Sequence, residues 1–126
     1  MNTIIYKELS DRIIGLALTV QCTLGPGLLE SAYEEAMCWE LRHSNIPFER
    51  QKVYPLRYKG DYISSYFADL VVDNKVILEL KAVQVLTAVM EAQIINYLRL
   101  SKIPVGYLIN FQGIKLEWKR FVCQRE

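Results

Sequence analysis

The sequence has few of the residues on which several common kinds of functional site depend. It contains one histidine, His43, and three cysteines that lie far apart without a Cys-x-x-Cys pair. This composition argues against a zinc centre and favours reduced thiols in a cytoplasmic protein. No apolar run approaches the ~20 residues of a membrane span, and the first residues lack the pattern of a signal peptide. We therefore expect neither a membrane protein nor a zinc protein.

An excess of charge of one sign is also missing. Fifteen Lys and Arg residues face fourteen Asp and Glu residues, which gives a net charge of +1. No overall field draws the chain to nucleic acid or membrane, so binding to either would need a local patch. Basic residues do cluster in two segments, at Arg50, Lys52, Arg57 and Lys59 and at Lys115, Lys119, Arg120 and Arg125. Each cluster could contact phosphates or could keep an exposed strand edge from aggregating.

The chain does contain enough apolar sequence for one globular domain over residues 1–126. Its composition is 52% hydrophobic and 23% charged, which is typical of a folded chain of this size. Apolar periodicity and turn residues predict the order α-α-β-β-β-α-β-β. The elements expected are a helix capped by Ser10 and Asp11, a helix over 28–43, strands over 48–60, 62–72 and 75–83, a helix over 88–102 capped by Thr87, and strands over 105–111 and 114–122.

This order places the chain in the α/β class, with an α+β-like character. Three consecutive strands followed by a crossover helix and two more strands imply a central mixed sheet flanked by helices. The third helix is expected to bury a stripe made of Val89, Ala92, Ile94, Ile95 and Leu98.

Three charged residues stand in the most apolar part of the sequence, the predicted hairpin "FADLVVDNKVILELKAV" over residues 67–83. Glu79 and Lys81 are two residues apart on a strand, so their side chains share one face. Asp69 joins them only in one register. A three-residue loop (73–75) would place Asp69 opposite Glu79, whereas a two-residue loop would send Asp69 to the other face.

Two carboxylates in direct opposition repel each other, and a divalent cation between them would remove that repulsion. Oxygen ligands without His or Cys favour a hard ion such as Mg²⁺ or Mn²⁺. Lys81 beside such an ion could orient a water molecule or stabilise charge on a phosphate. The alternative is that Glu79 and Lys81 form a solvated ion pair and Asp69 ends a strand.

The hairpin resembles the Asp…Glu-x-Lys core of the PD-(D/E)XK nuclease superfamily. The segment "GLLESAY" (27–33) is similar to the Gly-x-x-Glu-x-x-Tyr signature of the GxxExxY proteins, a branch of that superfamily. The segments "EAQIINYLRL" and "VGYLINF" also resemble that family's helix and following strand. The resemblance covers roughly residues 10–122 and implies a restriction-endonuclease-like core.

By this resemblance Asp69 and Glu79 would bind the metal ion together with the Leu80 carbonyl, and Lys81 would position or activate the attacking water. Glu30 matches the acidic helix residue of the superfamily, and Gln93 matches a polar residue that supports the lysine. Tyr33 and Tyr97 would be supporting residues, although both also fit as amphipathic core residues. Without the resemblance, Glu30 would be read as a carboxylate favoured at a helix N-terminus.

The first functional hypothesis is a small Mg²⁺-dependent phosphodiesterase acting on DNA or RNA. The alternative is a module on a nuclease-like fold that binds nucleic acid or protein without turnover, with a homodimer or a protein partner supplying further surface. A sugar- or nucleotide-processing hydrolase is less well supported, since Lys81 would keep both carboxylates ionised.

Overall fold

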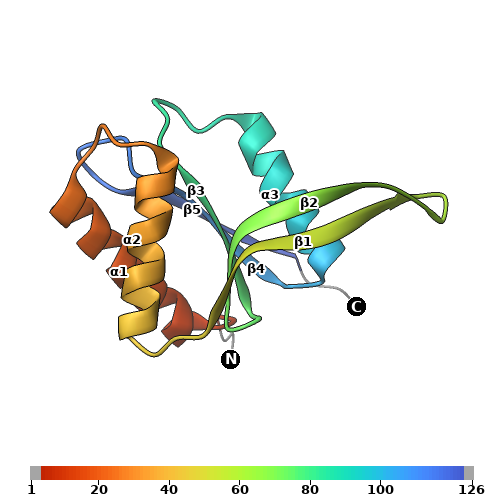
Figure 1. Ribbon diagram of the computed structural model, residues 1–126, viewed down its shortest axis with the longest axis horizontal. Coiled ribbons are helices and arrows are strands. Elements are labelled where there is room, and N and C mark those ends of the chain that lie inside the picture. The colour runs from red at the N-terminus through yellow and green to blue at the C-terminus, as the bar shows by residue number, and fades with distance from the viewer. Residues whose placement is uncertain (1–3, 124–126) are drawn as a thin grey trace.

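The computed structural model describes residues 4–123, and Arg125 of the second basic cluster lies outside this range. The elements follow the predicted order (Figure 1). They are α1 (Lys7–Leu24), α2 (Glu30–His43), β1 (Phe48–Tyr58), β2 (Asp61–Val72), β3 (Val76–Lys81), α3 (Ala88–Ser101), β4 (Val105–Asn110) and β5 (Glu117–Val122). No helix in the described part of the chain is both long enough and apolar enough to cross a bilayer.

The five strands form one mixed sheet in the order β1-β2-β3-β4-β5. Strands β3 and β4 are parallel, and the other neighbours are antiparallel. Helix α3 connects the parallel pair, as a crossover connection must. Helices α1 and α2 cover one face of the sheet and α3 covers the other (Figure 1). The predicted mixed sheet with flanking helices is therefore confirmed.

Alternation along the inner strands builds the two apolar layers. On β3, Val76 and Leu78 pack under α1 and α2, whereas Ile77 packs against α3. On β4, Gly106 lets α3 approach closely, because a Cβ atom there would lie 3.0 Å from the Ile94 Cδ1 atom. All these strand positions are buried, which explains why the inner strands read as continuous apolar runs.

One of the two expected helix caps is confirmed and the other is wrong. Helix α1 begins at Lys7, so Ser10 is not a cap. It is buried inside the helix, where its hydroxyl accepts a hydrogen bond from Arg120. On α3 the Thr87 cap is confirmed, since its hydroxyl accepts a hydrogen bond from the Met90 amide.

The expected apolar stripe of α3 is only partly correct. Ile94 and Leu98 are buried, but Val89, Ala92 and Ile95 are exposed, and Tyr97 is buried in their place. The helix carries apolar residues on more than one side, so periodicity alone does not fix which side faces the sheet. The close approach at Gly106 selects the side that holds Ile94 and Leu98.

Strands β1 and β2 continue beyond the rest of the sheet as a long hairpin, which we call the arm (residues 52–68; Figure 1). The hairpin changes face where the arm begins. Phe48 and Leu70 pack under α1 and α2, whereas Tyr54 and Ala68 pack against α3. All four are even-numbered positions, which regular alternation would keep on one face.

The change of face occurs at Gln51 and Asp69. The ladder pairs Arg50 with Leu70 and Lys52 with Ala68, but it skips the pair between them. Gln51 has a φ of 50°, a left-handed conformation that is uncommon for a residue with a side chain. This irregularity turns the arm relative to the sheet at the point where Asp69 stands.

Candidate active site

Asp69 and Glu79 meet where β2 and β3 separate. The ladder pairs Val72 with Val76 and Leu70 with Leu78, so the register of a three-residue loop is confirmed and Asp69 follows opposite Glu79. Beyond Leu78 the carboxylates replace the ladder: Glu79 Oε2 accepts a hydrogen bond from the Asp69 amide, and Asp69 Oδ2 accepts one from the Leu80 amide, both at 2.9 Å. Each carboxylate thus caps a backbone donor of the opposite strand.

Burial gives this pair unusual electrostatics. Glu79 is only 4% exposed, and its burial, reinforced by the negative charge of Asp69, raises its pKa from 4.5 to about 8. Burial also raises the pKa of Asp69, although the Leu80 amide opposes this effect. The positive charge of Lys81 lowers both pKa values but does not offset burial. The site therefore holds more buried negative charge than its neighbours balance.

Lys81 and Glu30 lie at the same end of β3. Lys81 is the last residue of the strand, half-buried, and pairs with Asn110 of β4. Glu30 is the first residue of α2, and its Oε2 accepts a hydrogen bond from the Ala82 amide at 3.4 Å. The fold thus brings the start of α2 to the position that directly follows Lys81, and Glu30 remains exposed there.

Tyr33 and Tyr97 occupy different surroundings. Tyr33 is fully buried, stacks on Phe111, and its hydroxyl donates to the Gly25 carbonyl at 2.6 Å and accepts from the Leu28 amide at 3.2 Å. It therefore fastens the turn that precedes Glu30. Tyr97 lies near the carboxylates: burial, followed by the charges of Glu79 and Asp69, raises its pKa to about 12.

Gln93 is the predicted site residue with the weakest connection to the carboxylates. It lies exposed on α3, one turn before Tyr97. Within residues 4–123, no hydrogen bond joins its side chain to Asp69, Glu79 or Lys81.

Comparison with known proteins identifies the family of the chain. The sequence model of the PD-(D/E)XK nuclease superfamily matches residues 7–121. The chain belongs to this superfamily. No curated protein matches it. Among solved structures, the crystal structure of SSO0001 is similar, with a TM-score of 0.57, 16% sequence identity and 96% of this chain covered. The chain spans only 59% of that protein's chain, and at this identity the likeness concerns the fold alone.

Two residues beside the acidic pair of this superfamily member were not anticipated from the sequence. The Gln51 side-chain nitrogen donates to Glu34 Oε1 at 2.9 Å and to Asp69 Oδ1 at 3.3 Å. Glu34 adds a third negative charge, which raises the pKa values of Asp69 and Glu79. Glu34 lies four residues after Glu30 on α2, so helical spacing could have indicated it. No sequence pattern indicated the left-handed conformation of Gln51.

The donor set of this site fits a hard divalent cation in part. Among the described residues, no group of three or more His, Cys, Asp or Glu side chains is arranged to hold a metal ion. Asp69 and Glu79 would supply two carboxylates, and water, the Leu80 carbonyl or a phosphate oxygen would complete the coordination. Mg²⁺ is commonly bound in this way, by one or two carboxylates together with substrate phosphate.

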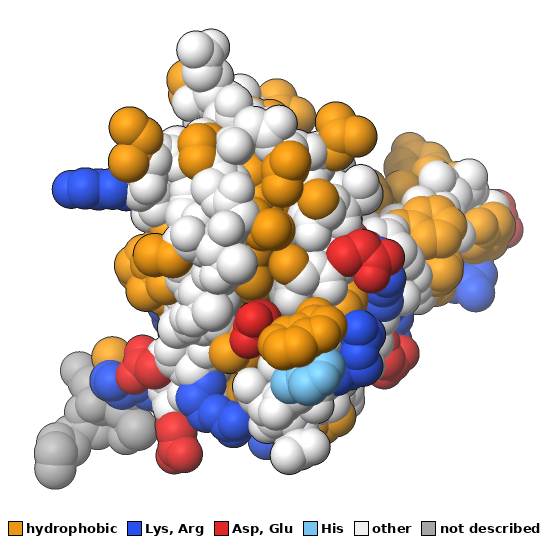
Figure 2. All heavy atoms as spheres, turned by 60° about the vertical axis from the view of Figure 1, so that its left-hand side comes forward, with side chains coloured by type: hydrophobic (Ala, Val, Ile, Leu, Met, Phe, Trp, Pro, Cys, Tyr) orange, Lys and Arg blue, Asp and Glu red, His pale blue; other side chains and the backbone are white. Residues whose placement is uncertain are grey.

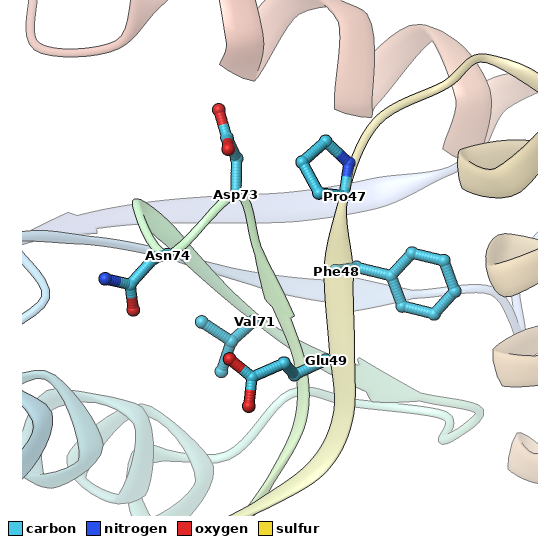
Figure 3. A pocket seen from close by; sticks show the side chains of 6 residues that line it. All are labelled: Pro47, Phe48, Glu49, Val71, Asp73 and Asn74. Carbon is cyan, nitrogen blue, oxygen red and sulfur yellow. The ribbon is translucent and has the colours of Figure 1, made fainter.

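Several surface hollows lie away from the carboxylates. One lies beside the β2–β3 turn, where Val71, Asn74 and Glu49 line it while the Phe48 ring points to the other side (Figure 3). Another is apolar and lies between α1 and α2, along the strip of hydrophobic side chains in Figure 2. Neither of these two hollows is lined by Asp69, Glu79 or Lys81, so the chemistry of the acidic pair belongs to neither.

Proposed function

We propose that this member of the PD-(D/E)XK superfamily is a small nuclease that hydrolyses phosphodiester bonds of DNA or RNA in the cytoplasm with Mg²⁺ or Mn²⁺. The observation that carries the proposal is the pair of buried carboxylates with raised pKa values beside Lys81. A cation would remove this imbalance of charge. We also assign the chain, as a single domain over residues 1–126, to the GxxExxY branch. The Tyr33 and Glu30 arrangement supports this assignment.

Asp69 and Glu79 would hold the cation, which would lower the pKa of a bound water and neutralise charge on the phosphate. The remaining residues act on the substrate side of the site. Lys81 carries its ammonium group near both carboxylates, where it can hold the attacking water or stabilise the negative charge that develops on phosphate. Glu30, exposed at the same end of β3, can accept a hydrogen bond from a water molecule.

Tyr97 and Gln93 lie on α3 and have supporting roles in the proposal. Tyr97 is buried, its ring packs edge-on against Tyr66 with centroids 5.2 Å apart, and the charge of Glu79 acts on its hydroxyl, so Tyr97 can limit access of water to that carboxylate. Gln93 lies one helical turn away on the same side of α3, from which it can reach a bound substrate.

A second candidate, a binding module without turnover, is favoured by one observation. Both Asp69 oxygens already accept hydrogen bonds from protein donors, Gln51 and the Leu80 amide. In that alternative the carboxylates serve only as backbone caps, and a homodimer or protein partner would provide the biological activity.

A cleavage assay with labelled single- and double-stranded DNA and RNA, in Mg²⁺, Mn²⁺ or EDTA, tests the proposal. We expect Lys81→Met to reduce the rate by ~10²-fold or more, because it removes one preorganised charge, while nucleic-acid binding changes far less. Lys7→Met is the matched control, since Lys7 is exposed on α1 and, within residues 4–123, forms its ion pair with Asp11. Activity that survives in Lys81→Met, or that resists EDTA, would contradict the proposal.

A further inference from the structure

Near the sheet, the arm has one packed face and one open face, whereas Tyr58 at the tip is 61% exposed. Tyr54, Tyr66 and Ala68 pack against α3. Alternation places the next side chains on the opposite face, where the ladder pairs Val53 with Phe67 and Pro55 with Ser65. The register shifts between Leu56 and Arg57, and beyond this irregularity Arg57 pairs with Tyr62. A hydrogen bond between the Tyr62 hydroxyl and the Ser65 hydroxyl confirms that these two side chains share the face.

This open face is apolar and aromatic although nothing in the described structure covers it. Val53 is 50% exposed, Phe67 53% and Tyr62 58%. Exposed apolar and aromatic side chains that gather on one surface often mark a binding site. The arm projects from the sheet (Figure 1), so this face is open to a ligand along its length.

The open face begins at the acidic pair. Phe67 precedes Asp69 by two residues and Val53 follows Gln51 by two residues. At ~3.3 Å per residue, the Phe67 backbone lies about 7 Å from that of Asp69. One end of a ligand that lies along the arm would therefore reach the carboxylates and Lys81.

The charge of the arm identifies the sign of that ligand. Residues 52–68 carry three basic side chains and one acidic side chain, a net charge of +2 in a chain that is otherwise close to neutral. Lys52 forms an ion pair with Glu49 just outside this range, so Arg57 and Lys59 are the basic residues that can meet a ligand. Arg57 stands on the open face, and no carboxylate within residues 4–123 forms an ion pair with it. A guanidinium group that has no ion pair among the described residues and lies opposite the exposed Tyr62 suits a polymer of phosphates and bases.

We infer that the open face of the arm binds an unpaired nucleic-acid strand and leads it to the carboxylates. Phe67 and Tyr62 stack on exposed bases, and Arg57 binds a backbone phosphate. The strand is unpaired because bases in a duplex already stack on one another, and because two available cations are few for a double row of phosphates. The inference rests on the proposed function only for the place of the scissile phosphate.

Fluorescence anisotropy with labelled single-stranded DNA and RNA, and with a duplex of the same sequence, tests this inference. The measurement is made in EDTA, so that binding is read without cleavage. We expect Phe67→Ala and Tyr62→Ala each to weaken single-strand binding by roughly 5- to 150-fold, the range for losing one base–aromatic stack. Phe67→Trp, which keeps an aromatic ring, should restore binding. Arg57→Ala should lower the salt slope by about 0.7, as for one phosphate on a single strand.

Trp118→Ala is the matched control, because Trp118 is also an exposed aromatic residue, at 43%, but lies on β5 at the other edge of the sheet. Its affinity should equal that of the wild type. The inference is overturned by unchanged binding in Phe67→Ala and Tyr62→Ala, by tighter binding of the duplex, or by no binding at all. It is also overturned if sedimentation shows that these variants disrupt a dimer, since the face would then bind a second copy.

The two proposals fail in different ways. If arm variants lose single-strand binding but the wild type shows no metal-dependent cleavage, the arm inference stands and the nuclease proposal is wrong. If the wild type cleaves, Lys81→Met is inactive, and the arm variants neither bind more weakly nor raise KM, the nuclease proposal stands and the arm inference is wrong.

Discussion

Replacing Glu79 by glutamine should remove most of the pH dependence of folding stability. The pKa of Glu79 rises from 4.5 to about 8 on folding, chiefly because the side chain is buried. A raised carboxyl pKa means that the folded protein retains a proton that the unfolded chain releases. The contribution of Glu79 to the free energy of unfolding is therefore fully present below pH 4.5 and is lost as the pH rises to about 8.

The size of the effect follows from the shift. Each pH unit of difference corresponds to ~1.4 kcal/mol, so the wild type should lose about 5 kcal/mol between pH 4.5 and pH 8. Such a loss is comparable to the whole stability of a small domain. Glutamine keeps the length of the side chain and an oxygen that can accept the Asp69 amide, but it does not ionise.

Urea unfolding in EDTA at several pH values between 5 and 8 measures this dependence. We expect the free energy of unfolding to fall steeply with pH in the wild type and to vary little in Glu79→Gln. Glu8→Gln, at an exposed position on α1, should behave like the wild type. Equal wild-type stabilities at pH 5 and pH 8, or an unchanged slope in Glu79→Gln, would refute the reasoning.

Two further predictions concern the acidic pair and the turn before it. Mg²⁺ should raise the melting temperature more at pH 8 than at pH 5, because protons compete for the same oxygens, and stabilisation should reach about 1.4 kcal/mol at ten times Kd. Asp69→Asn should weaken that response, and an unchanged response would speak against Asp69 as a ligand. Tyr33→Phe should cost about 1 kcal/mol in urea unfolding by removing the hydroxyl from Gly25 and Leu28, and a loss of several kcal/mol would show a larger role.

The sequence specified the hairpin better than its surroundings. A three-residue loop fixes which positions face each other, so the opposition of Asp69 and Glu79 could be derived from residue numbers. The Thr87 cap was equally local. The side of α3 that faces the sheet could not be predicted locally, because it depends on the close approach of α3 to Gly106 on the next strand, β4.

The surroundings of Asp69 depend on contacts that no local pattern records. Gln51 adopts a left-handed conformation although glutamine is not a typical turn residue. Its position follows from Glu34, which itself is held by Arg50 through a hydrogen bond of 2.6 Å. These residues come from α2 and β1, so their meeting with Asp69 is a property of the assembled fold.

The structural and chemical roles of the two carboxylates compete, and this competition makes the acidic pair informative. As caps, Asp69 and Glu79 accept hydrogen bonds from backbone amides that would otherwise have no partner where β2 and β3 separate. That role needs only acceptor oxygens, which asparagine and glutamine also provide. Binding of a divalent cation is strengthened by negative charge, which the side chains of asparagine and glutamine lack. If the pair serves only as caps, Asp69→Asn and Glu79→Gln should be stable and functionally neutral. If the pair binds a cation, the same variants should be at least as stable without metal and should lose the response to Mg²⁺. Stability and metal response, measured together, therefore separate the two roles without any assumption about the substrate.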